Sequence, residues 1–131
     1  MTLFFEIPLR AKAKQSTRFS RRGCFTDKKL KNYQAQVKWL LRNQYRKPLI
    51  SQPVKVDIKA FFKIPKKYHK QAPLLIGKPY PKMPDSDNIA KCFLDCLKGI
   101  VIEDDRIATE KRVVKVYGLE NRVEIRLEVI T

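Results

Sequence analysis

The chain has 131 residues, which is enough for one folded domain with its own hydrophobic core. Hydrophobic residues make up 44% of it, which excludes a disordered tail. A net charge of +16 and a pI of about 10.0 argue against an ordinary acidic enzyme for small neutral substrates and favour a polyanionic partner.

The charge is unevenly distributed along the chain. Residues 1–82 hold 21 Lys and Arg and only three acidic residues, a net charge of +18, whereas residues 83–131 hold 8 basic and 10 acidic residues, a net charge of −2. The first part is typical of a phosphate-binding surface. A protein that only binds nucleic acid has no obvious use for the acidic cluster in the second part.

The N-terminal part predicts a strand, a basic loop and a helix. Leu3 to Leu9 is the expected strand, and residues 10–25 form a loop with six basic side chains. Thr26 and Asp27 supply a helix N-cap, and apolar residues then recur at helical spacing from about 27 to 46. Pro48 is expected to end this helix.

The middle of the chain predicts a strand followed by a long loop. Apolar and polar residues alternate from Pro53, and the strand is expected to reach Ile64. Residues 65–84 are rich in Pro and Lys and also carry aromatic residues, which suits contacts to a nucleic-acid backbone and its bases. The alternative is a solvated surface loop.

The C-terminal part predicts one helix and two strands. Asp87 is the expected N-cap of a helix from about Asn88 to Lys98, with Gly99 ending it. Strands are expected over Arg112–Tyr117 and Val123–Val129. The order of elements predicts a single α+β domain over residues 1–131, with a mixed β-sheet of about four strands and two main helices packed on it.

The three cysteines, Cys24, Cys92 and Cys96, do not form a secreted disulfide framework. Cys92 and Cys96 lie four apart, so we expect both in the core of the second helix. Zinc is disfavoured because His69 is the only histidine. We find no signal peptide and no apolar run long enough for a membrane span, and we expect a cytoplasmic protein without a membrane or an organic cofactor as partner.

The residues that suggest chemistry are five charged side chains around the second helix. Asp85 and Asp87 lie at its start, where the helix dipole favours negative charge, and Lys91 follows one turn later. After Gly99 the chain is expected to turn back and deliver Asp104 or Asp105 beside Asp85. Three converging carboxylates repel one another unless a cation lies among them, and an oxygen-only ligand set favours Mg²⁺ or Mn²⁺.

A divalent metal in a chain suited to phosphates indicates phosphodiester hydrolysis. Lys91 is placed to contact the scissile phosphate. The alternative is ordinary helix capping by Asp87 and an ordinary turn at Asp104 and Asp105. Asp95 is better explained as an ion-pair partner of Lys91 than as a metal ligand.

The stretch from Lys82 to Lys91, with Asp95 and the run from Leu97 to Asp105, resembles the signature of the RusA family of Holliday junction resolvases. That signature is approximately K-P-D-x-D-N-x-x-K, then x-x-x-D-x-L-N-G and a hydrophobic run ending in D-D. Residues 14–19 resemble the family's basic K-x-R-P-R-F loop more loosely, and Phe25-Thr26 also fits. Three departures are Ser16-Thr17 in place of Arg-Pro, Lys98 in place of Asn, and Met83 inserted before Pro84.

The resemblance implies a small homodimeric, Mg²⁺-dependent endonuclease with an α+β fold, of a kind frequent in phages and prophages. Family members bind four-way DNA junctions and nick two opposed strands symmetrically. Their essential acidic residues match Asp85, Asp87 and Asp105, and their essential lysine matches Lys91.

We therefore predict a homodimeric endodeoxyribonuclease that resolves Holliday junctions. Asp85, Asp87 and Asp105 are the expected Mg²⁺ ligands, with Asp104 as an additional ligand or a residue that orients one. Mn²⁺ is expected to substitute. The expected DNA contacts are Lys12, Lys14, Arg18, Arg21, Arg22, Lys66, Lys67, Lys70, Lys78 and Lys82. The alternatives are a non-catalytic basic nucleic-acid-binding protein and a nuclease for other branched substrates.

Overall fold

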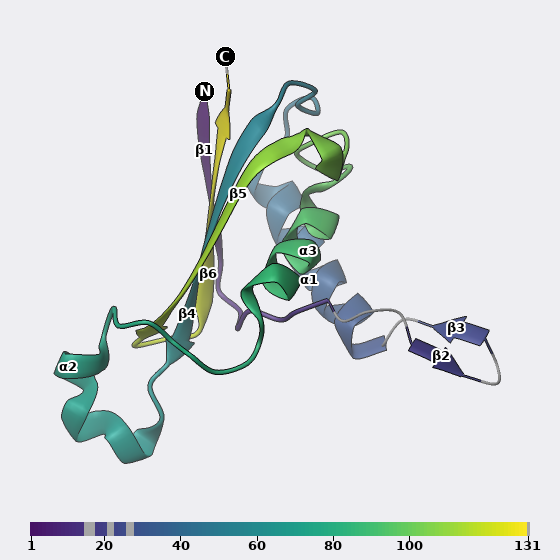
Figure 1. Cartoon of the computed structure of the whole chain (residues 1–131). Coiled ribbons are helices and arrows are strands. Elements are labelled where there is room, and N and C mark those ends of the chain that lie inside the picture. The colour runs from purple at the N-terminus through teal and green to yellow at the C-terminus, as the bar shows by residue number, and fades with distance from the viewer. Residues whose placement is uncertain (15–17, 21–22, 26–27, 131) are drawn as a thin grey trace.

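The structure is a computed structural model, and it describes residues 1–14, 18–20, 23–25 and 28–130, without the side chains of 15–27 (Figure 1). The strands are β1 (Thr2–Ile7), β2 (Arg18–Ser20), β3 (Gly23–Phe25), β4 (Val54–Lys63), β5 (Ala108–Gly118) and β6 (Arg122–Val129). The helices are α1 (Lys28–Gln44), α2 (Ala72–Leu75) and α3 (Ser86–Leu97), with short 3-10 helices η1 (Lys66–Gln71) and η2 (Asp105–Ile107).

The main sheet has four strands in the order β1-β6-β4-β5. β6 pairs antiparallel with β1 and β4, whereas β4 and β5 are parallel. A parallel pair needs a crossover connection, and here the crossover contains η1, α2, α3 and η2. The predicted α+β fold with a mixed four-stranded sheet is confirmed.

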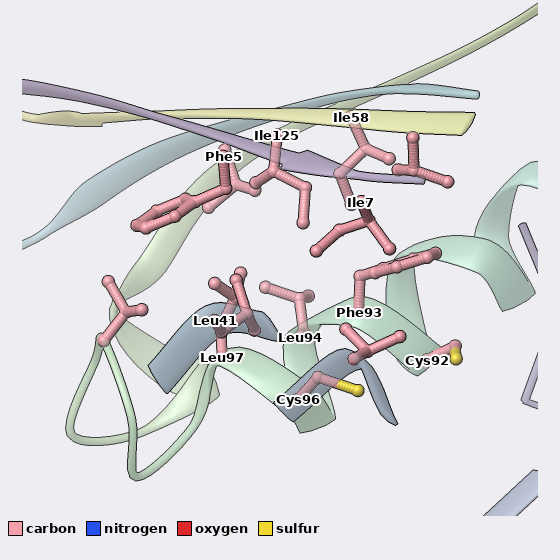
Figure 2. Packing of buried hydrophobic residues seen from close by; sticks show 14 of the residues in the cluster. Phe5, Ile7, Leu41, Ile58, Cys92, Phe93, Leu94, Cys96, Leu97 and Ile125 are labelled. Carbon is pink, nitrogen blue, oxygen red and sulfur yellow. The ribbon is translucent and has the colours of Figure 1, made fainter. Parts of the chain in front are cut away.

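The hydrophobic core lies between one face of the sheet and helices α1 and α3 (Figures 1 and 2). Alternate residues of β4, from Val54 to Phe62, are buried, as the pleat of a strand covered on one face requires. Phe93 of α3 is fully buried and makes an edge contact with Tyr33 of α1 at 6.3 Å. Cys92 and Cys96 are both buried, as expected.

Four local predictions need correction. The basic segment expected to be a loop contains the hairpin of β2 and β3, and the expected loop 65–84 contains η1 and α2. Strand β5 begins at Ala108 rather than Arg112, because it pairs with β4 over the whole length of that strand. The N-cap of α3 is Asp85 rather than Asp87. The expected cap of α1, Asp27, lies outside the described residues.

None of the described helices has the length and hydrophobicity that a membrane span requires.

Candidate active site

Asp85 and Asp87 lie together at the N-terminus of α3. Asp85 is the N-cap in an extended conformation, and its Oδ1 accepts a hydrogen bond from the backbone N–H of Asp87 at 3.2 Å. Both carboxylates are exposed. The partial positive charge of the helix N-terminus stabilises two negative groups at this position. A pair of accessible carboxylates therefore lies on a rigid helix end.

The segment before Asp85 is attached to β5 by backbone hydrogen bonds. The N–H of Gly77 donates to the carbonyl of Tyr117, and that of Tyr80 donates to the carbonyl of Lys115, both at 3.0 Å. In return, the N–H of Tyr117 donates to the carbonyl of Lys78 at 3.0 Å. These bonds extend the edge of the sheet and bring the approach to α3 close to the end of β5.

Lys115 makes a second connection to the same segment through its side chain. Its ammonium group donates hydrogen bonds to the carbonyls of Lys82 at 2.7 Å and Pro84 at 2.8 Å. It also lies 5.8 Å from the centre of the Tyr80 ring. Two charge-assisted hydrogen bonds to the carbonyls that precede Asp85 fix the position from which both carboxylates project. No sequence pattern indicated this role, because Lys115 resembles the other lysines of the predicted strands.

Contacts between aromatic rings also hold this segment against the sheet. The ring of Tyr80 stacks on Phe62 with a centroid distance of 4.1 Å, and it also makes an edge contact with the Tyr117 ring at 5.1 Å. Arg10 lies over the Phe62 ring at 5.4 Å and donates to the hydroxyl of Tyr80 at 3.4 Å. The stack joins the end of β1, the end of β4 and the approach to α3 in one place.

Lys91 lies on α3 one turn after Asp87 and is exposed. The expected ion pair between Lys91 and Asp95 is not formed. Asp95 instead pairs with Lys14, whose ammonium group lies 2.6 Å from its carboxylate. The ammonium group of Lys91 is therefore not held by Asp95, and Lys91 lies near the same end of α3 as Asp85 and Asp87.

Lys14 attaches the N-terminal segment to α3. Besides the ion pair with Asp95, its backbone N–H donates to the carbonyl of Asn88 at 3.0 Å. The ammonium group of Lys14, which was predicted to contact DNA, is paired with a carboxylate in this structure. The segment that leads into the hairpin of β2 and β3 is therefore held against the start of α3, and the hairpin itself projects away from the sheet (Figure 1).

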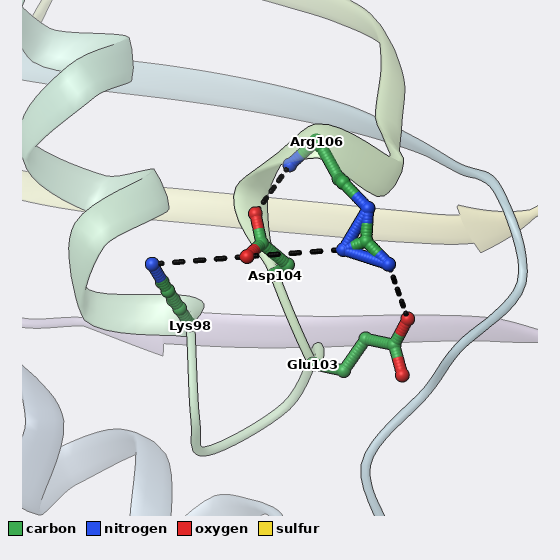
Figure 3. Close-up of polar contacts among 4 residues, drawn as sticks. All are labelled: Lys98, Glu103, Asp104 and Arg106. Carbon is green, nitrogen blue, oxygen red and sulfur yellow. Dashed lines mark hydrogen bonds and ion pairs between the residues drawn. The ribbon is translucent and has the colours of Figure 1, made fainter.

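Asp104 lies near the opposite end of α3 (Figure 3). Its carboxylate is 3.8 Å from the ammonium group of Lys98, the C-cap of α3, and accepts a hydrogen bond from the backbone N–H of Arg106 at 3.0 Å. The hydrogen bond from Arg106 is the main cause of the lowered pKa of Asp104. Asp105 is the next residue and begins η2.

The expected return of Asp104 or Asp105 to Asp85 does not occur within one chain. Among the described residues, which include Asp85, Asp87, Asp104 and Asp105, no three acidic, His or Cys side chains are grouped so that they could hold a metal. The cause is the parallel pairing of β4 and β5. The carbonyl of Ile50, just before β4, accepts from the N–H of Glu103, whereas Lys115 in β5 contacts the segment before Asp85. Helix α3, about 18 Å long, runs back between these two ends.

The other predicted DNA contacts are distributed over several exposed surfaces. Those with described side chains that are exposed are Lys12, Lys66, Lys67, Lys70, Lys78 and Lys82. Three of them belong to η1, which with α2 projects beyond the end of the sheet (Figure 1). The side chains of Arg18, Arg21 and Arg22 lie outside the described part of the structure.

Comparison with known proteins places this arrangement in a family. The family model for the endodeoxyribonuclease RusA matches residues 8–128. The chain is also 30% identical over 106 residues to the uncharacterized protein YqaN of Bacillus subtilis (strain 168). The matched region covers 76% of this chain and 74% of YqaN. This chain belongs to the RusA family. The resemblance seen in the sequence motifs is confirmed, and the chain is an endodeoxyribonuclease of the Holliday junction resolvase type.

In this RusA family nuclease, Lys115 offers a test of how the carboxylate pair is positioned. Replacing Lys115 with Met removes both hydrogen bonds to the carbonyls before Asp85 but keeps a long apolar side chain. We expect the rate of junction cleavage to fall at least about tenfold, because a small displacement of catalytic groups is costly. Lys115→Arg, which can still donate to carbonyls, should recover much of the rate.

The matched control is Lys59→Met, on the opposite face of the neighbouring strand, where Lys59 pairs with Val114. It removes the same charge and should change cleavage by less than about twofold. Equal losses in Lys59→Met and Lys115→Met would show that only the overall charge matters.

Proposed function

We propose that this chain resolves four-way DNA junctions by Mg²⁺-dependent, paired and symmetric nicking, as a homodimer of one domain per chain. The observation that carries the proposal is the pair of exposed carboxylates fixed at the N-terminus of α3, with Lys91 one turn away. These groups lie in a chain of net charge +16 that belongs to a family of junction-resolving nucleases.

The donor chemistry of Asp85 and Asp87 fits Mg²⁺. This ion is commonly held by one or two carboxylates and by substrate phosphates, and it keeps several waters. Mn²⁺ has similar preferences for oxygen ligands and is expected to substitute. When bound, the ion supplies a water of lowered pKa and neutralises charge on the phosphate oxygens. Asp85 and Asp87 orient it relative to α3.

Lys91 and the basic surfaces act on the DNA. Lys91 projects from the helix end that carries the two carboxylates, so it is placed to hold the scissile phosphate as a point charge. The lysines of η1 and the basic residues of the hairpin are farther in sequence from Asp85 and Asp87 than Lys91 is. They would hold the phosphates of the junction arms.

Asp105 would reach the site from a second copy of the chain in the homodimer. Within one chain, Asp104 and Asp105 follow the far end of α3, so they complete a three-carboxylate site only if a second copy brings them to Asp85 and Asp87. A two-fold dimer of this kind has two equivalent sites, which matches the two symmetric cuts that a four-way junction requires. Asp104 would orient Asp105 or add a ligand.

The direct experiment incubates the protein with a synthetic four-way junction and Mg²⁺ and maps the cuts. Nicks at symmetric positions in two opposed strands are the expected result. Efficient cutting of flaps, forks or RNA in preference to the junction would support a nuclease for other branched substrates. Junction binding without any cleavage would contradict the proposal and support the non-catalytic alternative.

A further inference from the structure

The outer face of α1 carries an exposed tryptophan among basic residues. Trp39, the single tryptophan of the chain, is 63% exposed, although tryptophan is usually highly buried. It lies on the side of α1 opposite the buried residues Leu30, Tyr33, Val37 and Leu41. Its indole ring therefore contributes little to the core, and its place in the sequence is not explained by the fold.

The charged residues on the same face of α1 are all basic. Its exposed cations are Lys28, Lys31 and Arg42, and exposed Arg46 follows two residues after the end of the helix. Helix α1 contains no Asp or Glu at all. Among the described residues, none of the ion pairs involves these four side chains. At 17 residues the helix is about 25 Å long, so its charges extend over several phosphates of a DNA strand.

Helical geometry aligns this surface. Lys28 lies 11 positions before Trp39, a separation close to a whole number of turns, whereas Arg46 follows two residues after the end of α1. Asn43, one turn after Trp39, donates to the carbonyl of Trp39 at 2.9 Å and accepts from the Arg46 guanidinium at 3.4 Å. The aromatic ring therefore lies in the middle of a basic stripe rather than at its edge.

We propose that this face of α1 binds single-stranded DNA, with its cations along the phosphates and an unpaired base stacked on Trp39. Stacking on an aromatic side chain needs a base whose face is open, which a fully paired duplex does not offer. A second copy of this chain is a poorer occupant, since a two-fold contact would place the four cations against the same four cations. This site rests on the proposed function, because on a branched substrate it would hold unpaired bases near the branch point.

The fluorescence of the single tryptophan reads this contact directly. Titration with an oligothymidylate of about 20 nucleotides, in EDTA, is expected to quench the emission of Trp39. Trp39→Ala should weaken binding of this strand about tenfold or more, as expected for the loss of one stacked base. The same variant should change binding of a blunt duplex by less than about threefold.

The control variants separate stacking from charge. Arg42→Ala should weaken binding and reduce the slope of log affinity against log salt concentration by about one. Lys55→Ala, in β4, should have a much smaller effect on both quantities. Circular dichroism checks that α1 is intact in each variant. Trp39→Phe, which keeps an aromatic face, should recover much of the affinity.

The result that would overturn the inference is unchanged emission together with equal binding by Trp39→Ala and the unmodified chain. A change in emission that depends only on protein concentration, without DNA, would also overturn it, since a second copy would then cover Trp39. Because EDTA prevents metal-dependent cleavage, this outcome is independent of whether the proposed nuclease mechanism is correct.

Discussion

Asp85→Asn is expected to lower the rate of junction cleavage by about a thousandfold or more while the fold and junction binding are retained. The variant removes one negative charge from the pair of carboxylates proposed to hold Mg²⁺, and loss of a metal ligand costs several kcal/mol of transition-state stabilisation. Asparagine is itself a good N-cap, so its side-chain oxygen can still accept the hydrogen bond from the N–H of Asp87. The measurements are single-turnover cleavage in Mg²⁺ and junction binding in EDTA.

The matched control is Asp95→Asn on the same helix. It removes an equal charge and breaks the ion pair with Lys14, yet Asp95 lies two turns beyond the proposed site. We expect less than about a fivefold change in cleavage, because a partly exposed ion pair contributes little. Cleavage by Asp85→Asn at close to the unmodified rate would remove Asp85 from the catalytic machinery.

Two inactive variants, Asp87→Asn and Asp105→Asn, are expected to regain activity when they are mixed. In the proposed homodimer each site takes Asp85 and Asp87 from one copy and Asp105 from the other. A mixed dimer of these variants then has one site with both substitutions and one site with none. The intact site should nick the junction in one strand only, with mixed dimers forming about half of the population after subunit exchange.

The control mixes Asp85→Asn with Asp87→Asn. Both substitutions lie at the start of α3, so every site in a mixed dimer contains one of them, and no activity should return. Equal inactivity in both mixtures, with subunit exchange verified by a tagged copy, would place all three carboxylates in one chain. In that case a movement of the segment between α3 and β5 would have to join them.

The secondary structure near the site was largely predictable because its signals are local. The apolar face of α3, with Ile89, Phe93 and Leu97, has helical spacing, and these residues are buried. The alternating residues of β6 likewise predict a half-buried strand. The cap of α3 was misplaced by two residues because Asp85 and Asp87 are both suitable capping residues, and only the backbone conformation shows which of them lies outside the helix.

Contacts between distant segments were not predictable in the same way. Lys14 was expected on DNA and Asp95 beside Lys91, but the packing of the N-terminal segment against α3 joins Lys14 to Asp95. Lys115 looks like any other lysine of a strand until the segment before Asp85 folds over its ammonium group. Many lysines and few carboxylates allow many pairings, and no local pattern in the sequence indicates which pair the fold brings together.

The α+β class, the concentration of basic residues in the first 82 positions and the family are all predictable without the structure, because periodicity, composition and short motifs are properties of neighbouring residues. The positions of the aspartates relative to one another depend instead on how the strands pair. Since β4 and β5 are parallel, the chain must return from the end of one strand to the start of the other, and α3 makes that return. The residues before and after α3 therefore lie at opposite ends of the sheet, and the carboxylates of one chain stay apart.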